Sequence, residues 1–314
     1  MMNHFIVDGH SDVLLNYLRD GNYNFKKKTK FQVDLPKMEE ANLLLEVFAV
    51  CPALAGDQAL KKSIKLIDKF NYLLENTKKI ELVRTYKEID NIIDSNKIAA
   101  VLSLEGADGI SNLSTLRVFY ELGVRMVTLT WNYKNYIAYG LAESEDGKGV
   151  TKFGKKFIKE MDDLGMVIDL SHLTPTSFWD VIKYSKNPLV ASHSNVKSIC
   201  NHKRNLTDNQ IKAIAKTDGL IGINFCPEFI KENKSEVEIT DLIEHINYIK
   251  NLVGIDYIGL GTDYDGITKT PKNLKDISKL PNLIDELKKN NFSNNEIEKI
   301  INKNWLRIFK KVLT

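Results

Sequence analysis

Cysteine is rare in this chain: its 314 residues include only Cys51, Cys200 and Cys226. An odd number of cysteines without CxxC spacing argues against a disulfide framework and against a zinc site built from thiolates. Proteins that use cysteine so sparingly are typical of reducing compartments. We therefore expect a fold held together by its hydrophobic core rather than by cross-links.

Long apolar runs and an excess of one charge are also absent. The 44 basic and 41 acidic side chains leave a net charge of +3, too small and too dispersed for a nucleic-acid-binding stripe. The N-terminal residues show no basic segment followed by an apolar one, and no stretch approaches the roughly 20 apolar residues needed to span a bilayer. We expect a cytoplasmic protein that binds neither nucleic acid nor membrane.

Short apolar, β-branched runs recur along the whole chain, with helical periodicity between most of them. Each run is nearly continuously apolar, which is typical of parallel strands covered on both faces. Helix start signals separate them, for example Thr174 before Pro175 and Thr207 three residues before Gln210. The predicted strands are 5–8, 43–50, 99–104, 126–130, 166–170, 188–191, 219–224 and 257–261, and the clearest helices are 58–75, 241–252 and 296–313.

Eight strands alternating with helices predict a (β/α)8 TIM barrel, a fold of about 250 residues plus insertions. The competing fold is an open, doubly wound sheet, which should carry a glycine-rich phosphate turn after its first strand. His10, Ser11 and Asp12 stand there instead. No linker or repeat interrupts the pattern, so we expect one barrel domain over residues 1–314.

Polar side chains stand at the carboxyl ends of the predicted strands, where barrel enzymes build their active sites. Any one histidine there would more often be structural than functional. Three of the chain's six histidines nevertheless fall at equivalent strand ends, a joint pattern that predicts a metal site. The strand ends read DGHSD (8–12), EG (105–106), SH (171–172), SHS (192–194) and DYDG (263–266), and the remaining histidines are His4, His202 and His245.

Imidazole and carboxylate ligands without thiolate suit Zn²⁺, with Mn²⁺, Co²⁺ or Fe²⁺ compatible with the same set. His10 and Asp12 point the same way from an extended strand end and can bind one ion, while His172 and His193 can bind a second. Glu105 arises between these groups and can bridge ions about 3.5–4 Å apart. A hydroxide bridging the two ions is then the expected nucleophile.

The ordered motifs resemble those of the membrane (renal) dipeptidase family of zinc metallopeptidases, which is related to the amidohydrolases. The resemblance extends over nearly the whole chain. It is carried by DGHSD (8–12), SLEG (103–106), LTWN (129–132), DLSH (169–172), ASHS (191–194), RNLTD (204–208) and GTDYDG (261–266).

The resemblance implies a site with two zinc ions bridged by a glutamate, and it assigns the same five ligand residues. It also implies that Asp263 shuttles the proton and that Arg204 binds the substrate carboxylate. Better-known mammalian members carry a substrate-contacting histidine where Trp131 stands, so Trp131 and Asn132 are expected to contact substrate here. Homodimerisation is an expectation that rests on the resemblance alone.

These arguments predict a binuclear zinc dipeptidase that cleaves small L-L and L-D dipeptides, with Glu105 and Asp263 as catalytic residues. Peptide hydrolysis at neutral pH needs an activated water, a Lewis acid and a proton donor, and this set supplies all three. Two alternatives stay open. One is another amidohydrolase reaction, on an N-acyl amino acid, a lactam or a lactone, and the other is a non-catalytic metal- or peptide-binding protein.

Overall fold

Parallel strands close into a barrel in the computed structural model, which describes residues 5–93, 95–143, 148–232 and 236–314. Neighbours around the barrel follow chain order, and β2 closes it by pairing with both β1 and β4. This confirms the predicted (β/α)8 barrel. In the described part of the chain its eight strands are β1 (Ile6–Ser11), β2 (Leu43–Val50), β4 (Ile98–Glu105), β5 (Val124–Thr128), β6 (Val167–Asp169), β7 (Leu189–Ala191), β8 (Leu220–Ile223) and β9 (Ile258–Leu260).

A ninth strand, β3 (Ile80–Leu82), escapes sequence prediction. It pairs with the first residues of β4, along the same edge that β5 occupies farther on. Three residues are too few to show a strand pattern, so only the tertiary pairing reveals β3. β3 therefore widens the sheet beside the N-terminal end of β4, and it is not one of the eight strands that close the barrel.

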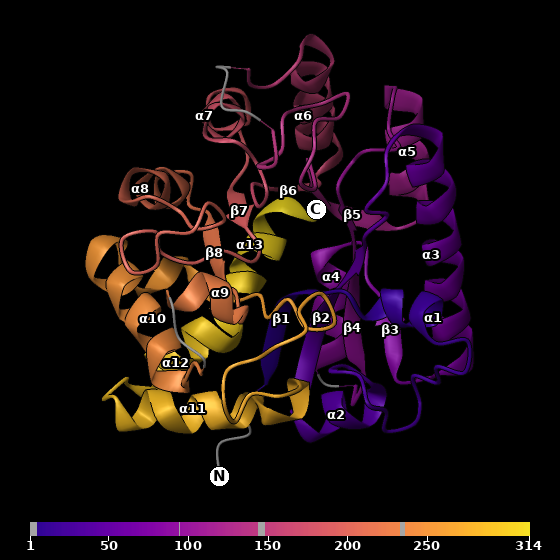
Figure 1. The fold of residues 1–314 in the computed structure, drawn as a ribbon. Helices are drawn as coiled ribbons and strands as arrows, with labels where there is room; N and C mark the ends of the chain where they lie inside the picture. The colour runs from indigo at the N-terminus through magenta and orange to yellow at the C-terminus, as the bar shows by residue number, and fades with distance from the viewer. Residues whose placement is uncertain (1–4, 94, 144–147, 233–235) are drawn as a thin grey trace.

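Helices surround the barrel and connect its strands (Figure 1). No helix of the described residues combines the length and hydropathy needed to cross a bilayer. The helices are α1 (Asn16–Arg19), α2 (Leu35–Glu40), α3 (Gly56–Asn76), α4 (Tyr86–Ile93), α5 (Leu113–Glu121), α6 (Lys152–Leu164), α7 (Pro175–Tyr184), α8 (Asp208–Lys216), α9 (Pro227–Ile230), α10 (Ile239–Val253), α11 (Leu280–Lys289), α12 (Asn294–Glu298) and α13 (Asn304–Val312), with short 3-10 turns at Val13–Leu15, Ile255–Tyr257 and Ile277–Lys279.

The predicted helix starts are confirmed. The side chains of Thr174, Thr207 and Ser293 accept hydrogen bonds from the third backbone N–H of α7, α8 and α12. Leu66 and Phe70 of α3 are buried against the barrel, whereas Ile64 is 51% exposed. Apolar residues lie on two adjacent faces of this 21-residue helix, and only the face that packs against the neighbouring strands is buried.

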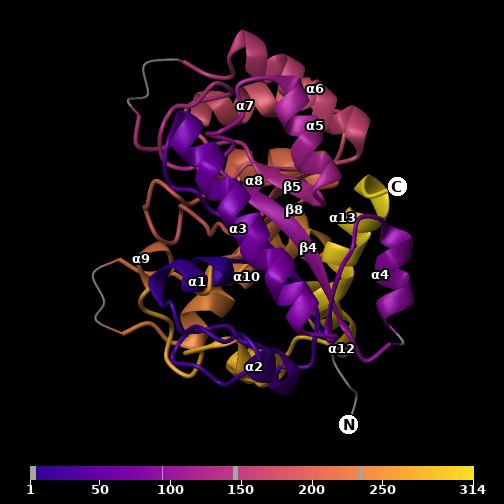
Figure 2. The ribbon, with the colours of Figure 1, turned by 90° about the vertical axis from the view of Figure 1, so that its right-hand side faces the viewer.

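The two ends of the barrel differ, as the side view shows (Figure 2). α1 and α9 lie at the end where the strands finish, and α13 lies at the opposite end. Trp305 and Phe309 of α13 pack there in one buried cluster with Val7 and other strand residues. The predicted helix 296–313 is real, but a π-helical turn at Lys299–Lys303 joins α12 to α13. The C-terminal helix thus fills the bottom of the barrel and leaves the top for the site.

Candidate active site

Five predicted ligand residues meet at the carboxyl ends of four barrel strands. His10 is the second-last residue of β1 and Asp12 directly follows that strand, Glu105 ends β4, and His172 and His193 follow β6 and β7. All five side chains are buried, with exposures from 0 to 7%. The barrel therefore gathers residues that lie up to 183 positions apart in the sequence into one cluster.

Glu105 lies at the centre of this cluster. Its Oε1 is 3.1 Å from His172 Nε2 and 3.6 Å from His193 Nε2, and its Oε2 is 3.7 Å from His10 Nε2. Asp12 Oδ2 lies 3.7 Å from the same His10 nitrogen. One oxygen of Glu105 thus faces the later histidines and the other faces His10, as a bridging carboxylate requires.

The cluster fits divalent cations on evidence from its own polar atoms. Both ring nitrogens of His10 and Oδ1 of Asp12 are buried and lack a hydrogen-bond partner among the described residues. Unpaired buried polar atoms are costly unless an ion or water satisfies them. Ligand atoms of His10, Glu105 and His193 also lie within 4.8 Å of one another, and so do those of His10, Asp12 and Asp263.

The pKa values of the three histidines also favour binding of a cation. Burial lowers the pKa of His172 to about 4 and holds the pKa of His193 well below its usual value, so both rings are neutral and can donate a lone pair to a cation. Burial opposes charge on His10 too, but Glu105 and Asp12 raise the pKa of His10 well above its usual value. A site that attracts a proton this strongly offers the same negative field to a metal cation.

Hydrogen bonds behind the histidines set which ring nitrogen faces the site. His172 Nδ1 lies 3.1 Å from Asn132 Oδ1 and therefore donates to it, which leaves Nε2, 3.0 Å from His193 Nε2, without a proton and facing the site. His193 Nδ1 lies 2.7 Å from Ser192 Oγ, whose own proton goes to Asp169 Oδ2 at 2.6 Å. His193 then donates through Nδ1 and also presents Nε2. Such partners fix ring orientation and strengthen ligand basicity.

Sequence reasoning assigned no role to Ser192 or Asp169 individually. Asp169 also accepts hydrogen bonds from Thr128 Oγ1 and from the N–H of Ser171. Both residues stand within predicted strand-end motifs, so a signal was present in their position. Their role is visible only once the fold brings β5, β6 and β7 side by side.

Asp263 and Arg204 both lie beside this cluster of five residues. Asp263 Oδ2 accepts a hydrogen bond of 2.9 Å from Asn224, and burial raises the pKa of Asp263 to about 6. Arg204 is 6% exposed; its Nη2 donates to the backbone oxygen of His193 at 3.3 Å, and its guanidinium lies 5.6 Å from the centre of the Phe229 ring. No carboxylate of the described residues forms an ion pair with Arg204.

Backbone strain is concentrated at these strand ends. His172 and Asp263 have backbone φ values of +69° and +62°, in the left-handed region that residues other than glycine adopt only rarely. Strain of this kind costs about 1–3 kcal/mol and persists where the surrounding structure enforces it. Both side chains are thereby aimed into the cavity rather than along the strand.

An open cavity of about 600 Å³ lies over the cluster. Trp131 and Asn132 both line it, as predicted, although the Asn132 oxygen is engaged with His172. His202, Cys51 and Cys226 line it as well. His245 is buried elsewhere, between the N–H of Val196 and the oxygen of Ile230, and His4 lies outside the described residues.

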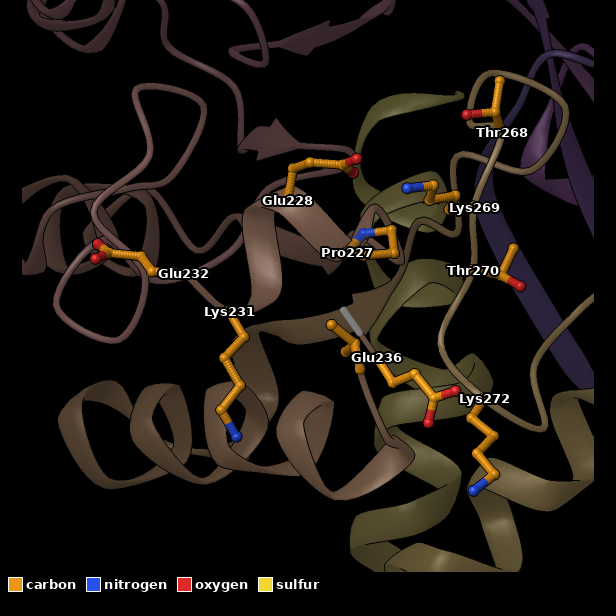
Figure 3. A pocket seen from close by; sticks show the side chains of 10 residues that line it. Pro227, Glu228, Lys231, Glu232, Glu236, Thr268, Lys269, Thr270 and Lys272 are labelled. Atoms are coloured by element: carbon orange, nitrogen blue, oxygen red, sulfur yellow. The ribbon is translucent and has the colours of Figure 1, made fainter. Parts of the chain in front are cut away.

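A second cavity of about 690 Å³ adjoins the first and shares Glu228 and Thr268 with it. Figure 3 shows its wall, where Lys269 extends toward Glu228 while Lys231 points away. Charged side chains of both signs alternate along this wall. The active-site cavity therefore opens beside a strongly polar surface on its α9 side.

Two solved metallopeptidases share this architecture. A Rhodobacter sphaeroides metallopeptidase, solved with a phosphinate mimic of the dipeptide L-Ala-D-Ala, is 26% identical over 98% of this chain and 99% of that chain, with a TM-score of 0.92. The crystal structure of a family M19 metallopeptidase, dipeptidase AC, is 27% identical over 98% of both chains, with a TM-score of 0.91.

A sequence relative supports the same conclusion. An uncharacterized dipeptidase of Schizosaccharomyces pombe is 32% identical over 99% of this chain and 81% of its own length. The model of the membrane dipeptidase family, peptidase family M19, matches residues 1–314. The predicted family is therefore confirmed, and the chain belongs to the M19 membrane dipeptidases, which are metallopeptidases that hydrolyse peptide bonds.

Proposed function

We propose that the protein is a binuclear zinc dipeptidase that cleaves the single peptide bond of small dipeptides. The observation that carries this proposal is the arrangement of Glu105 between two ligand groups, with one oxygen toward His10 and the other toward His172 and His193. Imidazole and carboxylate donors favour Zn²⁺ and accept Mn²⁺, Co²⁺ or Fe²⁺. When bound, the ions would supply the Lewis acid and lower the pKa of water.

Arg204 binds the substrate's carboxylate in this proposal. Its buried guanidinium has no carboxylate partner among the described residues, and a planar fork matches a carboxylate with two parallel hydrogen bonds. Arg204 donates to the backbone oxygen of His193, so it lies beside the cluster of proposed metal ligands. A free C-terminus held there places the adjoining peptide bond at the ions, which restricts substrates to very short peptides.

Asp263 carries the proton in this proposal. Its carboxylate shares a ligand cluster with His10 and Asp12, and burial raises its pKa to about 6. A carboxyl group with a pKa near the working pH can accept a proton from water and return it to the leaving amine. The hydrogen bond from Asn224 holds one of its oxygens in a fixed direction.

Stereochemical range is the finer part of the proposal. The Rhodobacter sphaeroides relative was solved with a mimic of L-Ala-D-Ala, and we propose that this chain also accepts L-D dipeptides. Trp131 and Phe229 give the cavity aromatic walls against which apolar substrate side chains can pack. We accordingly expect hydrolysis of both L-L and L-D dipeptides.

A panel of L-L and L-D dipeptides, assayed with metal analysis on the same preparation, tests the proposal. We expect hydrolysis that chelation abolishes and Zn²⁺ restores, with two ions per chain. N-acetylated dipeptides, lactams and lactones form the second arm of the panel. Hydrolysis of those compounds alone would favour another amidohydrolase reaction, and no hydrolysis with metal bound would favour a binding protein.

A further inference from the structure

Cys51 lies directly after β2 and faces the metal cluster. Its side chain is buried, 4% of the residue is exposed, and it lines the active-site cavity. Its sulfur and one carboxylate oxygen each from Asp12 and Glu105 all lie within 4.8 Å of one another. Zn–S and Zn–O bonds of about 2.3 and 2.1 Å span at most about 4.4 Å, so small side-chain rotations bring these three atoms to one ion.

A second observation, on the neighbouring Asp12, supports a metal-binding role for Cys51. Asp12 Oδ1 is buried and has no hydrogen-bond partner among the described residues. The cysteine therefore adjoins a buried carboxylate that has one unsatisfied oxygen, in a cavity already rich in ligands. The cysteine spacing in the sequence argues against a site made of thiolates, but a single thiolate supplied by the fold is compatible with it.

We propose that Cys51 is a sulfur ligand of the ion bound by His10 and Asp12. This inference rests on the metal centre of the proposed function. On binding, the thiol loses its proton to solvent and one metal–sulfur bond forms, without any change of oxidation state. Thiolate is a softer donor than carboxylate or imidazole, so this position would prefer Zn²⁺, Co²⁺ or Cd²⁺ over Mn²⁺.

Cys226 provides a matched control within the same cavity. Its thiol donates a hydrogen bond of 3.0 Å to Glu228 Oε2, on the α9 side, and it belongs to none of the candidate metal clusters of the described residues. A serine there removes one cavity thiol without touching the cluster. The third cysteine, Cys200, donates to the backbone oxygen of Glu228 and does not line the cavity.

The test is the near-ultraviolet spectrum of the full chain loaded with Co²⁺, since a thiolate bound to cobalt gives a charge-transfer absorption that nitrogen and oxygen ligands do not. We expect this absorption, normalised to bound cobalt, in the unaltered protein and in Cys226→Ser. It should be lost in Cys51→Ser and Cys51→Ala. Persistence of the absorption in either Cys51 variant, or its absence from the cobalt-loaded unaltered protein, would overturn the proposal.

Cadmium-113 NMR of the unaltered protein gives a second measurement that does not depend on a variant folding. One sulfur ligand should move one of the two cadmium resonances far downfield, and two resonances in the nitrogen–oxygen range would contradict the proposal. Dipeptide hydrolysis by the zinc-loaded protein separates the two hypotheses. Hydrolysis without a sulfur signature rejects Cys51 alone, a sulfur signature without hydrolysis rejects the dipeptidase function alone, and failure to bind metal rejects both.

Discussion

The side-chain amide of Asn224 donates a hydrogen bond of 2.9 Å to the carboxylate of Asp263. Asn224 directly follows β8 and is itself held firmly. Its N–H donates to Asn195 Oδ1 at 3.0 Å, and its Nδ2 also lies 3.3 Å from the backbone oxygen of His193. One amide thus sets the direction of the proposed proton carrier relative to the metal-binding histidine.

Replacing Asn224 with alanine should free the Asp263 carboxylate to rotate. Orienting partners of this kind are worth about 10- to 100-fold in activity at metal sites, so we expect kcat to fall by that factor. KM and metal content should change little, because no proposed ligand is removed. Steady-state kinetics with metal analysis check this, and an unchanged kcat would deny Asn224 its orienting role.

Asp263→Asn tests the proton carrier directly. An amide of the same shape cannot take a proton from water, so kcat should fall about 10²- to 10⁴-fold. The proposed ligand histidines and Glu105 are untouched, and two ions per chain should remain. Loss of metal together with activity would instead mean that Asp263 is needed to hold an ion.

Arg204→Lys should weaken binding of the substrate carboxylate. Lysine keeps the charge but lacks the planar fork. Truncating a buried charged contact costs about 2 kcal/mol or more, which is roughly a 30-fold loss in kcat/KM. The loss should be much smaller for dipeptide amides, which have no C-terminal carboxylate. An equal loss for both substrates would show that Arg204 acts on the site rather than on the carboxylate.

Much of the fold and site is predictable from the sequence, because the barrel imposes local signatures. Continuous apolar runs mark buried parallel strands, and each predicted ligand stands at a strand end. His10 and His172 therefore show their place without any tertiary information. Elements without such a signature are missed, as β3 illustrates with only three residues.

The residues missed at the site depend on contacts between strands. Ser192 passes a hydrogen bond from His193 to Asp169, which lies 23 positions earlier. Asn224 contacts Asp263 from 39 positions away. Each of these side chains is an ordinary polar residue in sequence, and only pairing of the strands gives it a partner.

Trp305 and Trp179 illustrate the same limit in the core. Trp179 is 43% exposed on α7, whereas Trp305 is fully buried, although both are large apolar side chains on helices. Trp305 Nε1 donates to the backbone oxygen of Leu260 at 2.7 Å. Room for its ring exists because Gly9 lacks a side chain: a Cβ there would lie 2.0 Å from Trp305 Cζ2.

Trp305→Ala should therefore lower the free energy of unfolding by about 3–5 kcal/mol, the usual cost of emptying a buried aromatic site. The exposed control, Trp179→Ala, should change it by less than about 0.5 kcal/mol. Denaturant unfolding of both variants checks the difference. Similar losses of unfolding free energy in the two variants would contradict the conclusion that α13 fills the bottom of the barrel.

Glu46 is a buried carboxyl group that the proposed chemistry does not use. It lies in β2 opposite Asp8 of β1, is fully buried, and neither of its oxygens has a hydrogen-bond partner among the described residues. Burial, together with the Asp8 charge, raises the pKa of Glu46 well above its usual value. The native state therefore keeps a proton on Glu46 that the unfolded chain releases.

The sign of the pH effect follows from this difference. Above the ordinary glutamate pKa of about 4.3, the native state binds more protons than the unfolded state, so Glu46 makes stability fall as pH rises. Glu46→Gln has nearly the same shape and cannot titrate. Its stability should match the unaltered protein near pH 4 and exceed it increasingly toward the raised pKa. Unfolding curves from pH 4 to 8, at equal metal content, measure this, and parallel pH profiles would show that Glu46 has an ordinary pKa in the folded protein.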